Sequence, residues 1–148
     1  MKIYIGADHR GFESKDRIKD FLTQANYWVK DVGDDRMEPD DDFPQFAGRC
    51  ASEVLGSDDP HARGILICGS GQGMCMGANR FKGIRAVLAH DKEAARSSRT
   101  DDDSNVICFP NDVVERGDWQ DILMSWLDTP FAGAPRYARR IKQLDDLG

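Results

Sequence analysis

An apolar run that ends in a cysteine and a glycine-rich segment constrains this chain more than any other feature. Residues 65–67 (Ile-Leu-Ile) are typical of a buried strand, and Cys68 stands at its carboxyl end. Three glycines follow at alternate positions: Gly69, Gly71 and Gly73. Residues 74–80 are then compatible with a helix. Since glycine lets backbone N–H groups turn toward one point and lets a ligand approach closely, the pattern predicts a strand, a tight loop and a helix.

This loop would place a thiol beside a site that favours negative charge. Its N–H groups, with the positive end of the next helix, can hold an anion or a developing oxyanion. A thiol beside such a site can ionise more easily than a free cysteine. A base next to an oxyanion hole is the equipment for proton abstraction beside a carbonyl. A plain strand-to-helix turn is the structural alternative.

Strand and helix patterns alternate along the 148 residues, a length that suits one domain. The predicted strands are residues 2–6, 27–32, 65–67, 84–89 and 105–109. The predicted helices are residues 12–25, 46–55, 74–80, 92–99, 113–127 and 135–144. This alternation predicts an α/β fold in which helices cover both faces of a parallel sheet.

Ligands of parallel sheets bind outside the carboxyl ends of the strands. That rule predicts that Asp8 and His9, which follow the first strand, lie near Cys68, and it places residues 101–103 at the same edge. His9 suits proton transfer or contact with a sugar oxygen, because imidazole titrates near neutrality. The alternative is that Asp8 caps the following helix and His9 is solvated.

Composition excludes several classes of protein. The formal net charge is −6 and no basic cluster occurs, so nucleic acid is not an expected partner. No apolar run reaches membrane-spanning length, and residues 1–5 enter a strand pattern without a signal peptide, so we expect a cytoplasmic protein. The four cysteines lack the spacing of a zinc site or a redox pair. Cys50, Cys75 and Cys108 are expected to pack in the interior.

Two arginines on the last predicted helix form a candidate anion site. Arg136 and Arg140 lie four residues apart, so they share a helix face. Paired guanidinium groups fit a phosphate or a carboxylate. The alternative is a solvated basic helix.

Taken together, these segments resemble the ribose 5-phosphate isomerase B and galactose 6-phosphate isomerase family. The shared motifs are Gly-Ala-Asp-His-x-Gly at 6–11, Ile-Cys-Gly-Ser-Gly-x-Gly-Met at 67–74, Ala-Asn-Arg at 78–80 and Gly-Ile-Arg-Ala at 83–86. The likeness covers essentially the whole chain. Some members use a glutamate as base just after the glycine loop; here that position is Met74, so Cys68 is the candidate and the ribose 5-phosphate branch is favoured.

The resemblance implies one domain over residues 1–148, folded as a Rossmann-like three-layer α/β/α sandwich with a five-stranded parallel sheet. It implies a homodimer or homotetramer with shared active sites, in which the C-terminal helix, about 135–146, packs on a neighbouring protomer. The implied reaction interconverts an aldose and a ketose phosphate through a cis-enediolate, with no metal or organic cofactor. Ribose 5-phosphate and ribulose 5-phosphate are the default pair.

Residue roles follow from the same resemblance. The residues implied in catalysis are Cys68, Ser70, Asp8, His9 and Asp101. Those implied in substrate binding are Gly69, Gly71, Gly73, Asp102, Arg136 and Arg140. Cys68 would move the proton between C1 and C2, and the loop amides with the Ser70 hydroxyl would hold the enediolate oxygens. Asp8 and His9 would contact the sugar and help to open its ring, and the two arginines would bind the phosphate.

Four positions depart from the family pattern. Asp101 stands where a histidine assists ring opening, and Asp102 stands where an asparagine donates to an enediolate oxygen. Asp112 replaces an arginine that reaches a phosphate, and Tyr137 replaces a histidine. A carboxylate at 101 can still act as acid or base, but an ionised Asp102 cannot donate a hydrogen bond. The alternative substrates are therefore a tetrose phosphate, another pentose phosphate or an unphosphorylated sugar. The alternative to an enzyme is a non-catalytic sugar-binding or partner subunit.

Overall fold

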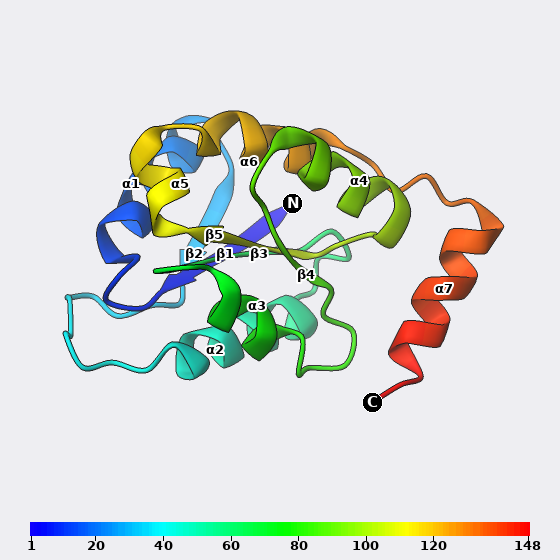
Figure 1. Ribbon diagram of the computed structural model, residues 1–148, viewed down its shortest axis with the longest axis horizontal. Coiled ribbons are helices and arrows are strands. Elements are labelled where there is room, and N and C mark those ends of the chain that lie inside the picture. The colour runs from blue at the N-terminus through cyan, green and yellow to red at the C-terminus, as the bar shows by residue number, and fades with distance from the viewer.

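The computed structural model describes all residues, 1–148, and shows a three-layer α/β/α sandwich around one five-stranded sheet (Figure 1). All strand pairs are parallel and their order is β2-β1-β3-β5-β4. The strands are β1 (Lys2–Ala7), β2 (Trp28–Asp31), β3 (Arg63–Cys68), β4 (Ala86–Leu88) and β5 (Val106–Pro110). The predicted fold class is confirmed, and the strand that ends in Cys68 lies at the centre of the sheet.

Helices cover both faces of the sheet. They are α1 (Phe12–Gln24), α2 (Phe43–Gly56), α3 (Gln72–Ala78), α4 (Lys92–Asp102), α5 (Asn111–Arg116), α6 (Trp119–Asp128) and α7 (Pro135–Asp145). Figure 1 shows α1, α4, α5 and α6 on one side of the sheet and α2 and α3 on the other. None of the helices combines the length and the apolar character needed to span a bilayer.

Alternate side chains of each strand supply the two halves of the core. In β3, Ile65 and Ile67 pack with α1, α5 and α6, while Leu66 and Cys68 pack with α2 and α3. Every residue of β3 is buried, as expected for a central strand covered on both faces. Cys50 and Cys108 are buried and Cys75 is half-buried, so the three cysteines assigned to packing lie where the sequence predicted.

The segment 113–127, predicted as one helix, forms two. Helix α5 ends at Arg116 and α6 begins at Trp119. The break is at Gly117, whose φ of +89° lies in the left-handed region that no α-helix interior uses. The apolar face of the predicted helix still reaches the core, because Trp119, Ile122 and Trp126 are buried.

The prediction that residues 101–103 lie at the same sheet edge as Cys68 is wrong within one chain. Helix α4 begins after β4 and runs back along the sheet to the edge where β5 begins. There Asn105 hydrogen-bonds to the backbone of Gly64, near the start of β3. It also hydrogen-bonds to the backbone of Arg85, the residue before β4. Cys68 pairs with Pro110 at the other end of the strands. At about 3.3 Å per residue, the six residues of β3 separate the two edges by roughly 17 Å.

Helix α7 stands apart from the sandwich. It contains no buried residue; within the chain it lies beside α4, and its C-terminal end faces residues 79–87. Figure 1 shows it on the side of the molecule away from α1 and α5. A helix that packs so little against its own chain has its apolar side chains available to another surface, and Leu144 is 51% exposed.

Gly64 tests the packing of the central strand. A Cβ at position 64 would lie 2.7 Å from Cys50 Sγ and 3.0 Å from Val106 Cγ2. We expect Gly64→Ala to lower the free energy of unfolding by about 1–3 kcal/mol in urea denaturation, because both neighbours are buried and must shift. Gly56→Ala, where a Cβ would meet no atom within 4 Å, is the control and should change it by less than about 0.5 kcal/mol. Equal losses for the two variants would contradict this account of the packing.

Candidate active site

Cys68 is held at the carboxyl end of β3 with its sulfur turned back toward the following loop. The residue is 5% exposed, and its Sγ accepts a hydrogen bond from the N–H of Gly71 at 3.1 Å. An N–H group that points at the sulfur stabilises negative charge there. The strand and loop therefore hold the sulfur of Cys68 beside a backbone donor at the carboxyl end of the central strand.

The loop that holds Cys68 depends on glycine at position 71. Gly71 has a φ of +74°, and a Cβ there would lie 2.5 Å from Leu88 Cδ1 and 3.0 Å from the backbone of Phe109. The N–H of Gln72 donates to Ser70 Oγ at 3.3 Å, while the N–H groups of Ser70, Gly73 and Met74 donate to no atom of the chain. Free donors beside a thiol can hold a negatively charged oxygen atom of a ligand.

Asp8 and His9 lie at the same edge, as predicted. Asp8 follows β1, and its N–H donates to the carbonyl of Ile67, the residue before Cys68, at 3.4 Å. Asp8 does not cap α1, which begins after Gly11 without a side-chain cap. Its carboxylate accepts the N–H of Arg10 at 3.0 Å. Burial raises the pKa of Asp8, and that hydrogen bond opposes the rise.

His9 has a carboxylate partner that the sequence analysis missed. Asp41 Oδ1 lies 2.7 Å from His9 Nδ1 and also accepts the His9 backbone N–H at 3.0 Å. The hydrogen bond to Asp41 raises the pKa of His9. Asp41 lies in the acidic loop that precedes α2, where six aspartates and glutamates in residues 34–42 give no periodic signal that would single out one of them.

Arg10 is a second residue that the sequence analysis missed. Its guanidinium lies against Gly69, where a Cβ would overlap it. The side chain forms no ion pair or hydrogen bond within the chain, although Asp8 and His9 are its neighbours in sequence. It therefore brings an unpaired positive charge to the mouth of the glycine loop. The motif at residues 6–11 includes the residues on either side of Arg10 but allows any residue at position 10.

Asp112 also lies at this edge. It belongs to the first turn of α5, next to Asn111, whose N–H donates to the Gly69 carbonyl at 3.2 Å. Asp112 is exposed, and Arg116 donates to it at 3.2 Å. Arg116, one turn later in the same helix, thus partly balances the negative charge of Asp112.

The remaining predicted site residues form a second group at the opposite edge. Asp101 is half-buried and Asp102 is exposed in the last turn of α4, while Arg136 and Arg140 are exposed on α7. Arg136 Nη2 donates to Tyr137 Oη at 3.2 Å, which raises the pKa of Arg136, and the charge of Asp101 acts in the same direction.

One chain therefore carries two half-sites. The first half-site contains Asp8, His9, Cys68 and residues 69–73, and the second contains Asp101, Asp102, Arg136 and Arg140. They lie at opposite edges of the sheet, so a single chain does not bring them to one ligand. No group of three or more His, Cys, Asp or Glu side chains in the chain is arranged to hold a metal ion.

Comparisons with known proteins agree with this geometry. The Ribose/Galactose Isomerase family profile matches residues 3–144. A probable ribose-5-phosphate isomerase B of Mycoplasma pneumoniae is 37% identical over 96% of this chain and 91% of that protein. A D-erythrulose-4-phosphate isomerase of Pectobacterium atrosepticum is 35% identical over 90% of this chain and 86% of that protein.

A solved structure shares the whole fold. Ribose-5-phosphate isomerase B from Mycoplasma genitalium, crystallised with bound ribulose-5-phosphate, has a TM-score of 0.90 and 35% identity, and the match covers 98% of this chain and 94% of that one. With the match of the family profile over nearly the full length, this shows that the chain belongs to the ribose/galactose isomerase family.

The pair of His9 and Asp41 predicts a measurable titration. Because the ion pair favours the protonated imidazole, His9 should titrate above its ordinary pKa of about 6.5. The stabilisation by this pair is present at low pH and is lost as the pH rises through the raised pKa. Asp41→Asn should shift the titration of His9, followed by its ring-proton NMR signal, to lower pH.

The signals of the exposed His61 and His90 are internal controls and should not move in Asp41→Asn. An unchanged His9 titration in this variant would show that Asp41 does not set the charge of the imidazole.

Proposed function

We propose that this protein is an aldose–ketose isomerase that interconverts ribose 5-phosphate and ribulose 5-phosphate. One observation carries the proposal. Cys68 Sγ accepts the Gly71 N–H beside a loop whose Ser70, Gly73 and Met74 N–H groups are free. Membership of the ribose/galactose isomerase family supports it, as does the likeness to a structure crystallised with ribulose-5-phosphate.

The chemistry uses these groups in a defined order. The Cys68 thiolate removes the proton from C2 of the open-chain aldose, and the electrons move to the C1 carbonyl oxygen to form a cis-enediolate. The free N–H groups of the glycine loop and the Ser70 hydroxyl donate to the enediolate oxygens. A proton then moves from the C2 hydroxyl to the C1 oxygen, and the Cys68 thiol returns its proton to C1, which leaves the ketose with its carbonyl at C2. A positioned base contributes typically 10²–10⁴-fold to such a rate.

Ring opening is assigned to Asp8 and His9. A cyclic sugar opens when a proton leaves the anomeric hydroxyl and another reaches the ring oxygen. Burial raises the pKa of Asp8 and Asp41 raises that of His9, so both groups are tuned toward the pH range in which they can exchange protons. Arg10, unpaired beside Gly69, supplies positive charge for the anionic substrate at this end.

A second copy of the chain completes the site in this proposal. Arg136 and Arg140 would bind the phosphate, and Asp101 and Asp102 would face the sugar, from a partner whose α7 packs across the dimer. The support is that the two half-sites lie at opposite sheet edges and that α7 buries no residue against its own chain. Met76, which is 65% exposed on the helix that follows the glycine loop, offers apolar surface for such a helix.

A tetrose phosphate is the second candidate substrate. The observation that favours it is Asp101, which stands where the family resemblance places a ring-opening histidine. A tetrose 4-phosphate carries its phosphate on the only hydroxyl that could close a five-membered ring, so its isomerase needs no ring-opening group. The relative from Pectobacterium atrosepticum is named for such a substrate.

The reaction is tested by proton NMR in D2O with purified protein and tetrose, pentose and hexose sugars, each with and without phosphate. We expect ketose formation with deuterium incorporation at the carbon next to the carbonyl, fastest with ribose 5-phosphate. Cys68→Ala should lower the rate by about 10²-fold or more while binding is retained, because it removes only the base.

Cys75→Ala is the matched control, since this thiol lies in α3 and bonds to the Ala86 carbonyl at 3.2 Å rather than facing the loop. Fastest turnover with erythrose 4-phosphate would select the second substrate. No turnover of any sugar by the folded protein would overturn the proposal in favour of a non-catalytic subunit.

The shared site predicts complementation between inactive subunits. Cys68→Ala damages the first half-site and Arg140→Gln the second, so a mixed dimer retains one intact site. Random mixing after unfolding and refolding should restore roughly one quarter of the wild-type rate in a two-fold symmetric dimer.

Mixing Cys68→Ala with Asp8→Asn is the control, since both changes lie in the first half-site and no mixed dimer has an intact one. Failure of the first pair to complement would show that each chain forms its site alone.

A further inference from the structure

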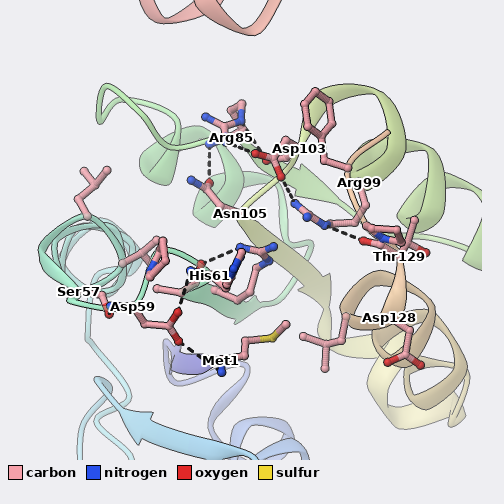
Figure 2. Close-up of a pocket in the computed structure, with 18 residues that line it drawn as sticks. Met1, Ser57, Asp59, His61, Arg85, Arg99, Asp103, Asn105, Asp128 and Thr129 are labelled. Atoms are coloured by element: carbon pink, nitrogen blue, oxygen red, sulfur yellow. Dashed lines mark hydrogen bonds and ion pairs between the residues drawn. The ribbon is translucent and has the colours of Figure 1, made fainter. Parts of the chain in front are cut away.

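A second pocket lies at the amino-terminal edge of the sheet, at the other end of β3 from Cys68. It has a volume of about 740 Å3, which is in the range of small-molecule sites. The end of α2, the starts of β3 and β5, and the segment after α6 form its walls (Figure 2). The Cys68 half-site contributes none of its lining residues.

Arg63, the first residue of β3, is a buried cation without a carboxylate partner. It is 8% exposed, and its Nη1 donates to the carbonyl of the adjacent Ala62 at 3.1 Å. Its Nε and Nη2 donate to no atom of the chain. Burial lowers the pKa of Arg63 to about 10, and the positive charge of Arg99 acts in the same direction. An unpaired buried charge is costly, so a partner for it would stabilise the protein.

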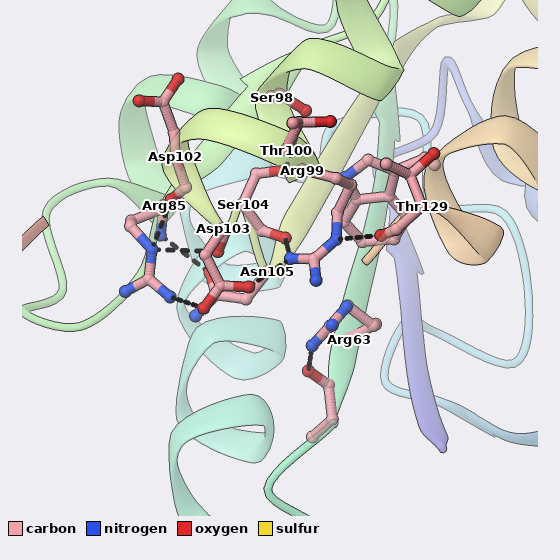
Figure 3. A network of polar contacts seen from close by, with 12 residues as sticks. Arg63, Arg85, Ser98, Arg99, Thr100, Asp102, Asp103, Ser104, Asn105 and Thr129 are labelled. Atoms are coloured by element: carbon pink, nitrogen blue, oxygen red, sulfur yellow. Dashed lines mark hydrogen bonds and ion pairs between the residues drawn. The ribbon is translucent and has the colours of Figure 1, made fainter. Parts of the chain in front are cut away.

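Arg99 presents a second free donor toward the same space. Its Nε donates to the Thr129 carbonyl at 3.2 Å and its Nη1 to Asp103 Oδ1 at 2.7 Å, but its Nη2 has no acceptor in the chain. The residue is 4% exposed. Figure 3 shows the guanidinium groups of Arg63 and Arg99 turned toward each other. Two like charges so placed repel unless an anion lies between them.

The acidic residues of the pocket are already engaged or point elsewhere. Asp103 accepts hydrogen bonds from Arg99 and, at 3.1 Å, from Arg85. Asp59 accepts the backbone N–H groups of Lys2 at 2.7 Å and His61 at 2.8 Å. Figure 2 shows the carboxylate of Asp128 pointing away from the arginines. No carboxylate of the chain forms an ion pair or hydrogen bond with Arg63, and the charges of Asp103 and Asp59 offset the effect of burial on its pKa only in part.

We propose that this pocket is a second ligand site, which binds a phosphate group between Arg63 and Arg99. Guanidinium groups form charge-assisted, directional hydrogen bonds with phosphate oxygens, and a dianion balances two of them. The pocket is larger than a phosphate ion, and Leu55, Leu127 and Phe131 line it, so a small organic phosphate fits its chemistry. The site is independent of the isomerase function proposed above.

The test follows the arginine Nε–H signals of the whole protein by NMR during titration with inorganic phosphate, and separately with ribose 5-phosphate, at constant ionic strength. The Arg140→Gln variant serves as background, because it weakens the phosphate contact assigned to the isomerase site. We expect a saturable shift of the Arg63 signal in both proteins. Arg63→Met, in which binding is followed by the Arg99 signal, should weaken this binding tenfold or more, which is about 1.4 kcal/mol.

Arg49→Met is the control for loss of a positive charge, because Arg49 lies on α2 and pairs with Asp34 at 3.1 Å. It should leave the Arg63 shift unchanged. If Arg63→Met does not fold, the signal that is lost in Arg63→Lys identifies the Arg63 Nε–H. The titration of the wild-type protein then tests whether phosphate binds at this residue.

Saturation by inorganic phosphate would support a site for the phosphate group alone. Saturation only by ribose 5-phosphate would support a site for a phosphate ester. An Arg63 signal that does not move, or that moves without saturation, would overturn the proposal, as would an equal shift with succinate.

Discussion

The burial of β3 between β1 and β5 is the constraint on which the rest of the molecule depends. Its six residues are all buried, and alternate side chains enter the two halves of the core. Because a central parallel strand is hydrogen-bonded on both sides, its two ends are held firmly at opposite edges of the sheet. One end carries Cys68 and the glycine loop, and the other carries Arg63. The strand thus fixes both the candidate active site and the second pocket, and it keeps them apart.

The division of the candidate active site into two half-sites follows from the direction of the chain. In a parallel sheet each connecting helix returns from the carboxyl edge to the amino edge. Residues at or just after the end of a strand, such as Cys68 and Asp8, lie at the carboxyl edge, while Asp101 and Asp102, at the end of the helix that leads into β5, lie at the amino edge. The helix that carries Arg136 is the one helix with no buried residue. These facts support the proposal that a partner chain supplies the second half-site.

The site residues differ in how far their places could be predicted. The rule that ligands bind at the carboxyl ends of parallel strands predicted the places of Asp8, His9 and Cys68, because each lies at or just after the end of a strand. The same rule failed for residues 101–103, which precede a strand at the end of a helix that extends to Asp102. Asp41 lies on an irregular loop among other acidic residues, so only the fold shows that it pairs with His9. Arg10 was hidden for a different reason, since its contact with Gly69 joins segments 59 residues apart in the chain.

By itself, the sequence determined the α/β class, the alternation of strands and helices, and the place of the glycine loop after the buried strand that ends in Cys68. These depend on local features, namely apolar periodicity and the backbone freedom of glycine, which the order of residues displays directly. Only the tertiary structure decided which polar groups meet. In the structure, His9 pairs with Asp41, and the predicted helix is interrupted at Gly117. Asp101 and Asp102 lie at the sheet edge opposite Cys68, and the guanidinium group of Arg63 faces that of Arg99. Such contacts depend on strand order and helix direction, which place groups distant in sequence within a few ångströms of each other.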